Sequence, residues 1–332
     1  REKAMLSMVK ERFDDIVVVL NIGGIMDLSW VKNDDRISSA LLGWQGGMEG
    51  GLAMAELLTG KGNPSGKLAD TFAADVNDYP STANFHESFD YVNYTEDIYV
   101  GYRYFETIPG AAERVNYPFG FGLSYTDFDW KMTGASEENG VITVLTEVTN
   151  TGKTAGKEVV QLYVKDMTSS AIRPEKELKG FEKVQLTSGE TKTVTMKLDK
   201  RSFAWYNTEL HDWYAASGKY EILIGASSRD IRLSETIELS SSQVIPMHVH
   251  MNTTLGELLR YPKTKETAKE LTSKYLSAMN GGSETASESA AEAISEEMVE
   301  AMTDSMPLRS LCSFGGFSRT EIQEIIDKLQ EI

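Results

Sequence analysis

The sequence predicts a partial α/β sandwich, then an all-β sandwich, then an acidic helical tail, and three observations support this order. In residues 1–124 short apolar runs alternate with helical patterns, which is typical of an open, mostly parallel sheet. In residues 125–245 the apolar period becomes two, and glycine-rich turns separate the segments as in a β-sandwich. In residues 246–332 the spacing becomes helical around a small, acidic stretch near 280–293, which predicts a flexible linker.

The elements of the first domain follow from short runs. "IVVVLNIGG" (16–24) is continuously apolar, which predicts a strand buried on both faces, and "RISSALLGW" (36–44) predicts a second strand. "GLAMAELLTG" (51–60) has helical spacing and ends in glycine, so we expect a helix. "DIYVGYRYFE" (97–106) alternates aromatic side chains, and we expect it to be extended rather than helical.

The later elements follow from a change of period. In "GVITVLTEVTN" (140–150) the apolar residues Val141, Thr143 and Leu145 alternate against the other face, which predicts a strand. Beyond it the tail predicts helices, of which the last begins at a serine cap. The expected helices are 254–279, 295–306 and 318–332.

Composition limits the partners and the compartment. The 332 residues are 41% hydrophobic and 25% charged, which is globular composition. A net charge of -17 argues against nucleic acid and anionic membranes, whereas a neutral sugar meets no such repulsion. No apolar run approaches the roughly 20 residues that span a bilayer. A single cysteine, Cys312, excludes an internal disulfide and leaves the compartment open.

Few motifs indicate cofactor or metal chemistry. "NIGGIM" (21–26) lacks the G-x-G-x-x-G spacing, so its glycines predict a tight strand exit rather than a nucleotide site. His248 and His250 would share one face of a strand, but without a nearby third ligand they predict no metal site. No G-x-S-x-G occurs, and Cys312 has no obvious base. We therefore expect neither a cofactor nor a metal.

"LLGWQGGMEGG" (41–51) is the stretch most typical of a ligand site. It places Trp44 and Glu49 in a glycine-rich loop after a predicted strand, where open α/β sheets bind ligands. An indole face stacks on sugar C–H groups, and a carboxylate accepts bonds from hydroxyls. The alternative is that Trp44 packs in the core while Glu49 stabilises the N-terminus of the next helix.

Several motifs in order resemble one enzyme family. "VVVLNIGG", "NPSGKLADTF", "YVGYRYFE" and "YPFGFGLSYTDF" resemble the C-terminal half of glycoside hydrolase family 3. The following "TNTGKTAGKEVVQLYV" and "YEILIGASSRDI" are similar to that family's fibronectin type III-like domain. Two positions depart from the family pattern: Gln45–Glu49 read QGGME instead of a Pro-Gly-Gln spacing, and Asp97 stands where glycine is usual.

The resemblance implies a retaining, bacterial β-glucosidase-like enzyme that needs no cofactor. It places no catalytic residue in this chain: the aspartate nucleophile and the glutamate acid/base are expected upstream of Arg1. A preceding segment with a (β/α)8 barrel would supply them, and Trp44 and Glu49 would contact a neutral glycoside. "REKAMLSMVKERFDD" starts within a helical pattern, so we expect a later portion of a longer gene product. The alternative is a non-catalytic carbohydrate-binding or scaffolding protein.

The resemblance also gives a role to residues 117–128, which we call the junction segment. Its glycines would allow tight turns where the first domain meets the β-sandwich. Its five aromatic side chains would pack the contact between the two domains. They are Tyr117, Phe119, Phe121, Tyr125 and Phe128.

Overall fold

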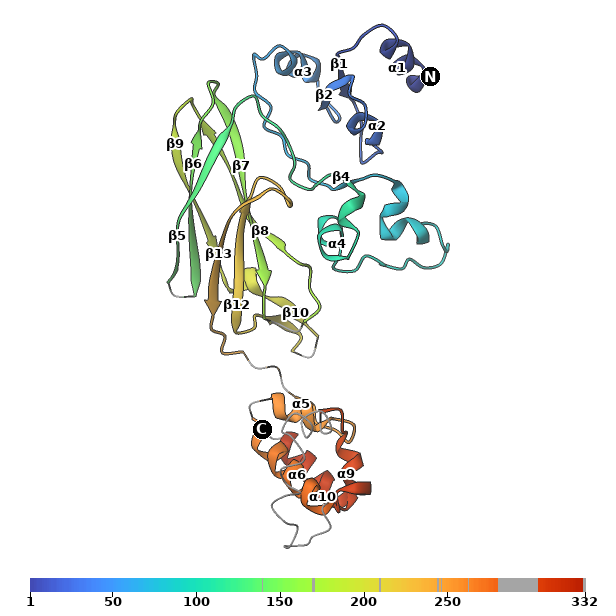
Figure 1. The fold of residues 1–332 in the computed structure, drawn as a ribbon, viewed down its shortest axis with the longest axis vertical. Helices are drawn as coiled ribbons and strands as arrows, with labels where there is room; N and C mark the ends of the chain where they lie inside the picture. Colours follow the sequence, from blue (N-terminus) through green and yellow to red (C-terminus); the bar gives the residue numbers. More distant parts are fainter. Residues whose placement is uncertain are drawn as a thin grey trace, which may run out of the picture. The chain divides into compact units, whose positions relative to one another are not determined.

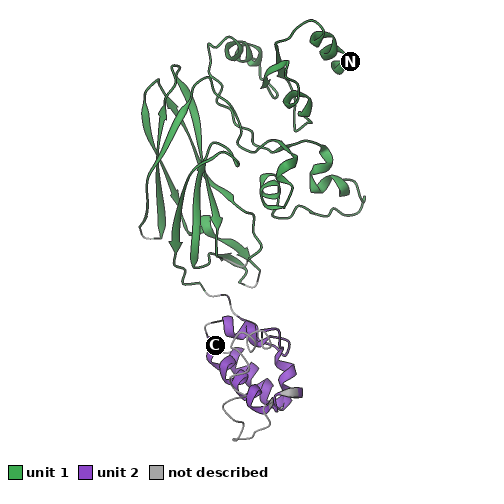
Figure 2. Cartoon of the chain, viewed as in Figure 1, with its two compact units in different colours: residues 1–243 green, residues 244–332 purple. Residues whose placement is uncertain are grey.

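The protein is described by a computed structural model and divides into two compact units, residues 1–243 and 244–332 (Figure 2). The linker predicted near 280–293 and most of the helix predicted at 295–306 lie outside the described residues. No described helix combines the length and the apolar character that crossing a membrane requires. The described residues are 1–138, 140–168, 171–208, 210–243, 245, 247–261, 263–279 and 304–330.

The first unit begins with a parallel pair of strands, β1 and β2, as the sequence predicts. One face of the pair packs on the buried side chains of Leu28, Val31 and Phe72. On the other face Val17 is 52% exposed and Val19 41% exposed, so the expectation of burial on both faces was wrong for this chain. The flanking helices α1 and α3 bury no side chain of their own and leave that face open. The bounds are α1 Glu2–Lys10, β1 Ile16–Leu20, α2 Ser29–Lys32, β2 Ile37–Leu42 and α3 Gly50–Leu58.

The rest of the α/β part, residues 1–124, contains an antiparallel pair, β3 and β4, and a helix, α4. The helix contradicts the extended conformation expected for 97–106. Tyr102 and Phe105 lie three residues apart and share its buried face, so the aromatic spacing is helical. The bounds are β3 Phe72–Ala73, η1 Val76–Asp78, η2 Pro80–Asn84, α4 Tyr102–Thr107, η3 Ala112–Arg114 and β4 Val115–Tyr117.

A β-sandwich follows, as predicted (Figure 1). Its sheets have the strand orders β5-β6-β9 and β13-β12-β7-β8, with antiparallel neighbours, and they enclose a core of 18 buried side chains. Alternation in β6 is confirmed, but Ile142, Val144 and Val148 fill the core, and the opposite face is only half-buried. The bounds are β5 Phe128–Glu138, β6 Val141–Asn150, β7 Gly156–Asp166, β8 Glu177–Leu186, β9 Thr191–Leu198, η4 Lys200–Phe203, β10 Trp205–Asn207, β11 Asp212–Tyr214, β12 Gly218–Gly225 and β13 Ile231–Leu239.

The aromatic side chains of the junction segment have different surroundings. Phe119 stacks on Tyr102 with ring centroids 4.7 Å apart, within a cluster that includes the buried Tyr163 of the sandwich. Phe121 is half-buried and packs on Tyr117 at 5.4 Å. Phe128 packs against the sandwich core. Phe119 is therefore the ring that joins the two parts.

Tyr125 corrects the expectation that all five rings pack this contact. Its side chain is 53% exposed, and its hydroxyl donates to the carbonyl of Leu57 at 2.9 Å. Tyr125 therefore ties the junction segment to α3 with its hydroxyl, while much of its ring stays in solvent.

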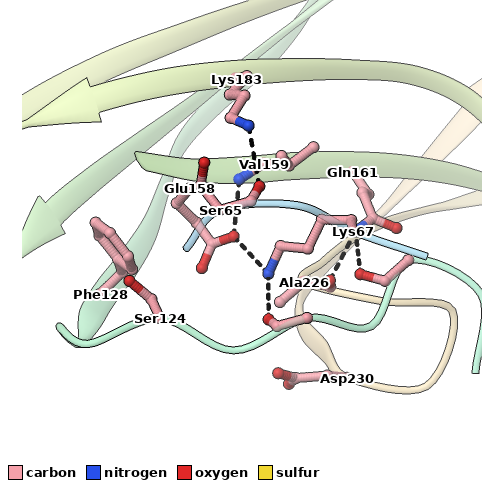
Figure 3. Close-up of polar contacts among 12 residues, drawn as sticks. Ser65, Lys67, Ser124, Phe128, Glu158, Val159, Gln161, Lys183, Ala226 and Asp230 are labelled. Carbon is pink, nitrogen blue, oxygen red and sulfur yellow. Dashed lines mark hydrogen bonds and ion pairs between the residues drawn. The ribbon is translucent and has the colours of Figure 1, made fainter. Parts of the chain in front are cut away.

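Buried polar groups complete the contact between the α/β part and the sandwich (Figure 3). Lys67 Nζ lies 2.9 Å from Glu158 Oε1 and donates to the carbonyl of Gly122 at 2.7 Å. Gln161 Nε2 donates to the carbonyls of Gly120 and Ala226 at 3.1 and 2.7 Å. A buried polar network stabilises a structure only when its members are paired, as these are. The network therefore favours one arrangement of the two parts.

Helix α4 adds charged contacts to the same sandwich. Glu106 lies 2.9 Å from Arg229 Nε and 3.5 Å from Lys176 Nζ. The hydroxyl of Tyr102 accepts a hydrogen bond from the backbone N–H of Leu178 at 2.8 Å. The helix that the sequence reading missed is thus one of the elements that hold the α/β part against the sandwich.

The second unit is helical in its described residues, as predicted, but the expected helix at 254–279 is divided into two, α5 and α6. Its apolar side chains form a core of 12 buried residues, and α5 starts at Thr254 with a capping box to Glu257. His248 and His250 lie outside any strand, so the expectation of a shared strand face was wrong. The bounds are α5 Leu255–Arg260, α6 Lys265–Met279, α9 Leu308–Phe314 and α10 Arg319–Gln330.

Candidate functional site

The loop of residues 43–49, which we call the site loop, connects β2 to α3. It starts at the carboxyl end of β2, and the N–H of Gly43 donates to the carbonyl of Leu20, the last residue of β1, at 2.8 Å. Because β1 and β2 are parallel, their carboxyl ends meet at one edge, which is where ligands bind open α/β sheets. The parallel pairing thus places the predicted loop at the position expected for a site.

A cavity of about 400 Å³ lies between the end of β2 and α3. Glu49 is the only ionisable residue among those that line it. A size in the range of small-molecule pockets and one carboxylate suit a neutral ligand better than a charged one. The lining residues are Leu41, Leu42, Gly43, Gly46, Gly47, Glu49, Gly50, Ala53, Met54 and Leu57.

Trp44 has an unusual backbone and a half-buried side chain. Its φ is 49°, in the left-handed region that few residues other than glycine occupy. Its ring meets the buried ring of Phe72 edge-on, with centroids 6.2 Å apart. This agrees with the alternative that Trp44 packs on the core, but the ring is not fully covered. The left-handed turn therefore fixes a partly exposed indole at the edge of the sheet.

Glu49 is exposed and occupies the N-cap position of α3, yet its side chain makes no capping hydrogen bond. The position agrees with the expected charge effect at a helix N-terminus, where a carboxylate is favourable. Because the side chain is not used as a cap, its oxygens can accept bonds from a ligand hydroxyl at the cavity.

Gln45 is a third polar candidate, which the sequence reading did not select. Its amide lies so close to Gly23, in the loop after β1, that a side-chain carbon at position 23 would be 2.8 Å from Gln45 Nε2. Glycine at position 23 therefore makes room for this amide. The sequence signal for this residue was the pair of glycines that follows the first strand. Its role becomes visible only in the structure, where β1 and β2 are neighbours.

The lining of the cavity lacks the pair of carboxylates that retaining glycoside hydrolysis uses. Retaining glycoside hydrolysis needs two carboxyl groups about 5–5.5 Å apart, and the cavity is lined by one. No group of three or more potential metal ligands occurs within the described ranges. Cys312 lies half-buried in the second unit. The site loop offers an indole edge, an amide and a carboxylate, of which the carboxylate belongs to a residue that lines the cavity.

Two family models match the chain. The model of the glycosyl hydrolase family 3 C-terminal domain matches residues 1–125, and that of the fibronectin type III-like domain matches residues 158–228. The first match covers the α/β part with the site loop, and the second lies within the β-sandwich.

Curated proteins and a solved structure indicate the same family. Beta-glucosidase A of Butyrivibrio fibrisolvens is 50% identical over 265 residues, which are 74% of this chain and 32% of that protein. Thermostable beta-glucosidase B of Acetivibrio thermocellus is 40% identical over 337 residues, covering 100% of this chain and 43% of that protein. The crystal structure of the Bifidobacterium adolescentis GH3 beta-glucosidase matches with a TM-score of 0.73 at 35% identity, over 80% of this chain and 38% of that one. The chain therefore spans less than half the length of these relatives.

Proposed function

Because this chain belongs to glycoside hydrolase family 3, we propose that it forms the C-terminal portion of a retaining β-glycosidase of the β-glucosidase type. The activity would be hydrolysis of terminal, non-reducing β-linked sugars by double displacement, without a cofactor. The observation that carries the proposal is 40% identity along the whole chain, helical unit included, with a thermostable β-glucosidase. The site loop adds a cavity of about 400 Å³ whose lining contains one carboxylate, which suits a neutral sugar.

In the proposed enzyme this chain positions substrate, and another segment cleaves it. The aspartate nucleophile and the glutamate acid/base would come from a preceding segment of the same gene product that carries the (β/α)8 barrel. Trp44 would contribute an aromatic edge at the rim, while Glu49 and Gln45 would hold sugar hydroxyls. Removal of these rim contacts should weaken binding more than it slows the chemical step.

The open face of the α/β part supports a covering segment. Val17 and Val19 expose one face of β1, and Leu52 and Leu58 of α3 are also exposed. Parallel sheets are normally covered on both faces, because the backbone and the apolar side chains of an open one invite association. An obligate contact of this kind typically buries more than about 2,000 Å². We therefore place the barrel-bearing segment against this face.

The test compares the 332-residue chain alone with the same chain joined to the barrel-bearing part of a family 3 β-glucosidase. With an aryl β-glucoside as substrate, we expect turnover only from the joined protein. In that protein Glu49→Gln should raise KM by about tenfold, which is about 1.4 kcal/mol, and leave kcat nearly unchanged. The neighbouring Met48→Ala is the control, since Met48 is fully exposed.

Two results would overturn the proposal. One is turnover by the chain alone that Glu49→Gln abolishes, because the site loop would then contain a catalytic carboxylate. The other is a joined, folded protein that hydrolyses no aryl glycoside, which would favour the non-catalytic alternative.

A further inference from the structure

Residues 84–98, which we call the aromatic loop, turn their rings outward. The loop runs between η2 and α4 and is the cyan stretch of Figure 1 on the side of the α/β part away from the β-sandwich. Phe89 is fully exposed and Tyr94 is 89% exposed, and Phe85 and Tyr91 are also largely in solvent. Aromatic side chains normally contribute their large apolar area to cores, so four outward rings in one loop indicate a contact surface.

Polar side chains within the loop hold it in shape. Asn84 Nδ2 donates to the carbonyl of Asn93 at 2.9 Å, and Thr95 Oγ1 donates to Asn84 Oδ1 at 3.1 Å. Asn93 Nδ2 in turn donates to Glu87 Oε2 at 3.1 Å. These bonds close the loop across its base, as in the compact Ω-loops that often carry function. The rings are therefore presented by a closed loop rather than by a loose strand.

The backbone is strained near each end of the loop. His86 has a φ of 64°, and its ring lies 4.4 Å from that of Phe85; Asp97 has a φ of 48°. A left-handed backbone is unfavourable at a residue other than glycine, and such positions cluster at ligand clamps. Asp97 occupies a position where the resembling family usually has glycine, which fits this conformation. The aromatic loop therefore contains two residues with an unfavourable backbone conformation.

The order of residue types favours a saccharide over a protein partner. Carboxylates and amides are interleaved with the rings, and no lysine or arginine occurs between residues 85 and 98. Protein interfaces exclude charged residues from their apolar centres, whereas sugar sites combine single aromatic faces with side-chain acceptors for hydroxyls. The acidic side chains also disfavour an anionic ligand. The interleaved carboxylates are Glu87, Asp90, Glu96 and Asp97.

From these observations we propose that the aromatic loop binds a neutral, β-linked oligosaccharide, with Phe89 and Tyr94 as stacking faces. The inference rests on the proposed function for the class of sugar. It assigns the loop a role separate from the site loop, because the two loops share no residue and only the site loop borders the cavity. A chain with this loop would hold a saccharide without cleaving it.

The test measures binding of cellopentaose to the 332-residue chain by isothermal titration calorimetry, with maltopentaose as the α-linked comparison. We expect binding of cellopentaose that Phe89→Ala and Tyr94→Ala each weaken by about tenfold. Phe181→Ala is the matched control, since Phe181 is a similarly exposed phenylalanine, but on the β-sandwich. Asn84→Ala removes no ring but breaks the closure, and should weaken binding as well.

Three outcomes would overturn the inference: no binding by the unaltered chain, binding that none of the loop variants changes, or equal binding of maltopentaose. A change in sedimentation coefficient on Phe89→Ala, without any effect on cellopentaose, would instead identify the loop as a contact between protein chains. Thermal unfolding of each variant checks that it is folded. Turnover is not measured, so a negative result leaves the proposed hydrolase standing, and an inactive joined enzyme leaves this inference standing.

Discussion

The β-sandwich and the α/β part bury their apolar residues to very different extents. The sandwich encloses 18 buried side chains between two sheets, whereas the α/β part has two clusters of four, around Phe72 and around Phe105. Most of the exposed large apolar side chains among the described residues lie before residue 125. The helical unit resembles the sandwich, because it surrounds a core of 12 buried residues, and no large apolar side chain is exposed among those whose burial the structure describes.

The difference shows which parts of the chain bury the apolar residues of their own sequence pattern. In a β-sandwich two sheets from one chain segment enclose the core, so the apolar residues of the alternating pattern are buried within that segment. A parallel strand pair needs cover on both faces, and here one face is open. We take the open face of β1 and the aromatic loop as the surfaces through which this chain contacts other molecules.

The largest expected effect sets the two regions directly against each other. Leu162 of β7 is fully buried, so Leu162→Ala should reduce the free energy of unfolding by about 2–5 kcal/mol. Val19→Ala, on the open face of β1, should change it by less than about 0.5 kcal/mol in the chain alone. Denaturant unfolding with hydrogen exchange, which reports the two regions separately, measures both. An equal loss of unfolding free energy for Val19→Ala would mean that this face is covered in solution. The predicted difference between the two regions would then be wrong.

The second prediction concerns Gly120 of the junction segment, for which Gly110, outside that segment, is the matched comparison. Gly110 and Gly120 have φ values of 76° and 80°, so alanine at either costs roughly 1–2 kcal/mol of backbone strain. Only at Gly120 would the new carbon collide with the Gln161 amide, whereas position 110 is open. Displacing that amide leaves buried carbonyls unpaired, so Gly120→Ala should cost a further 1–3 kcal/mol or so.

Thermal and denaturant unfolding of both glycine variants decide whether the junction is rigid. Equal losses for Gly110→Ala and Gly120→Ala would show that the Gln161 amide can move aside without cost. The two parts would then be joined less firmly than the hydrogen bonds of Gln161 indicate, and the junction could bend.

The smallest expected effect is a pH dependence at the same contact. Burial raises the pKa of Glu177, but the charges of Lys179, Arg173 and Arg103 outweigh burial and hold the pKa below its ordinary value. A lowered folded-state pKa stabilises the protein above the ordinary value of 4.5, and that stability is lost as the pH falls through the lowered pKa. Unaltered protein should therefore lose more stability on acidification than Glu177→Gln does.

Melting temperatures measured from pH 7 down to about pH 3 give the comparison. Glu177→Gln should be less stable than the unaltered chain at neutral pH, and the two should converge in acid. Glu182→Gln, at an exposed position of the same strand, is the control and should follow the unaltered chain. If the melting temperatures of Glu177→Gln and of the unaltered chain differed by the same amount at every pH, the ion pairs between α4 and the sandwich would not contribute to the pH dependence of stability.

The sequence predicted the helices and strands better than it predicted which of their faces are buried. The strands at 16–20 and 37–42, the helix at 50–58 and the β-sandwich were all expected from their own residues. The two strands follow from short apolar runs, the helix from helical spacing and the sandwich from a period of two. The helix at 102–107 was missed because the aromatic residues of 97–106 were interpreted as alternating, whereas Tyr102 and Phe105 lie three residues apart and share the buried face of the helix. In β6 the predicted period of two is confirmed, and the structure shows that Ile142, Val144 and Val148 lie on the face toward the core.

The sequence by itself predicted the order of the domains, the loop that contains Trp44 and Glu49, and the glycines of the junction segment, since these depend on local pattern and chain geometry. Ligand binding by that loop stays a prediction. Only the tertiary structure decided which faces are covered, because burial depends on segments far apart in the chain. It placed the amide of Gln45 against Gly23, left Val17 and Val19 in solvent, and closed the aromatic loop with its rings outside. These features depend on how the whole chain packs, which no local sequence pattern contains.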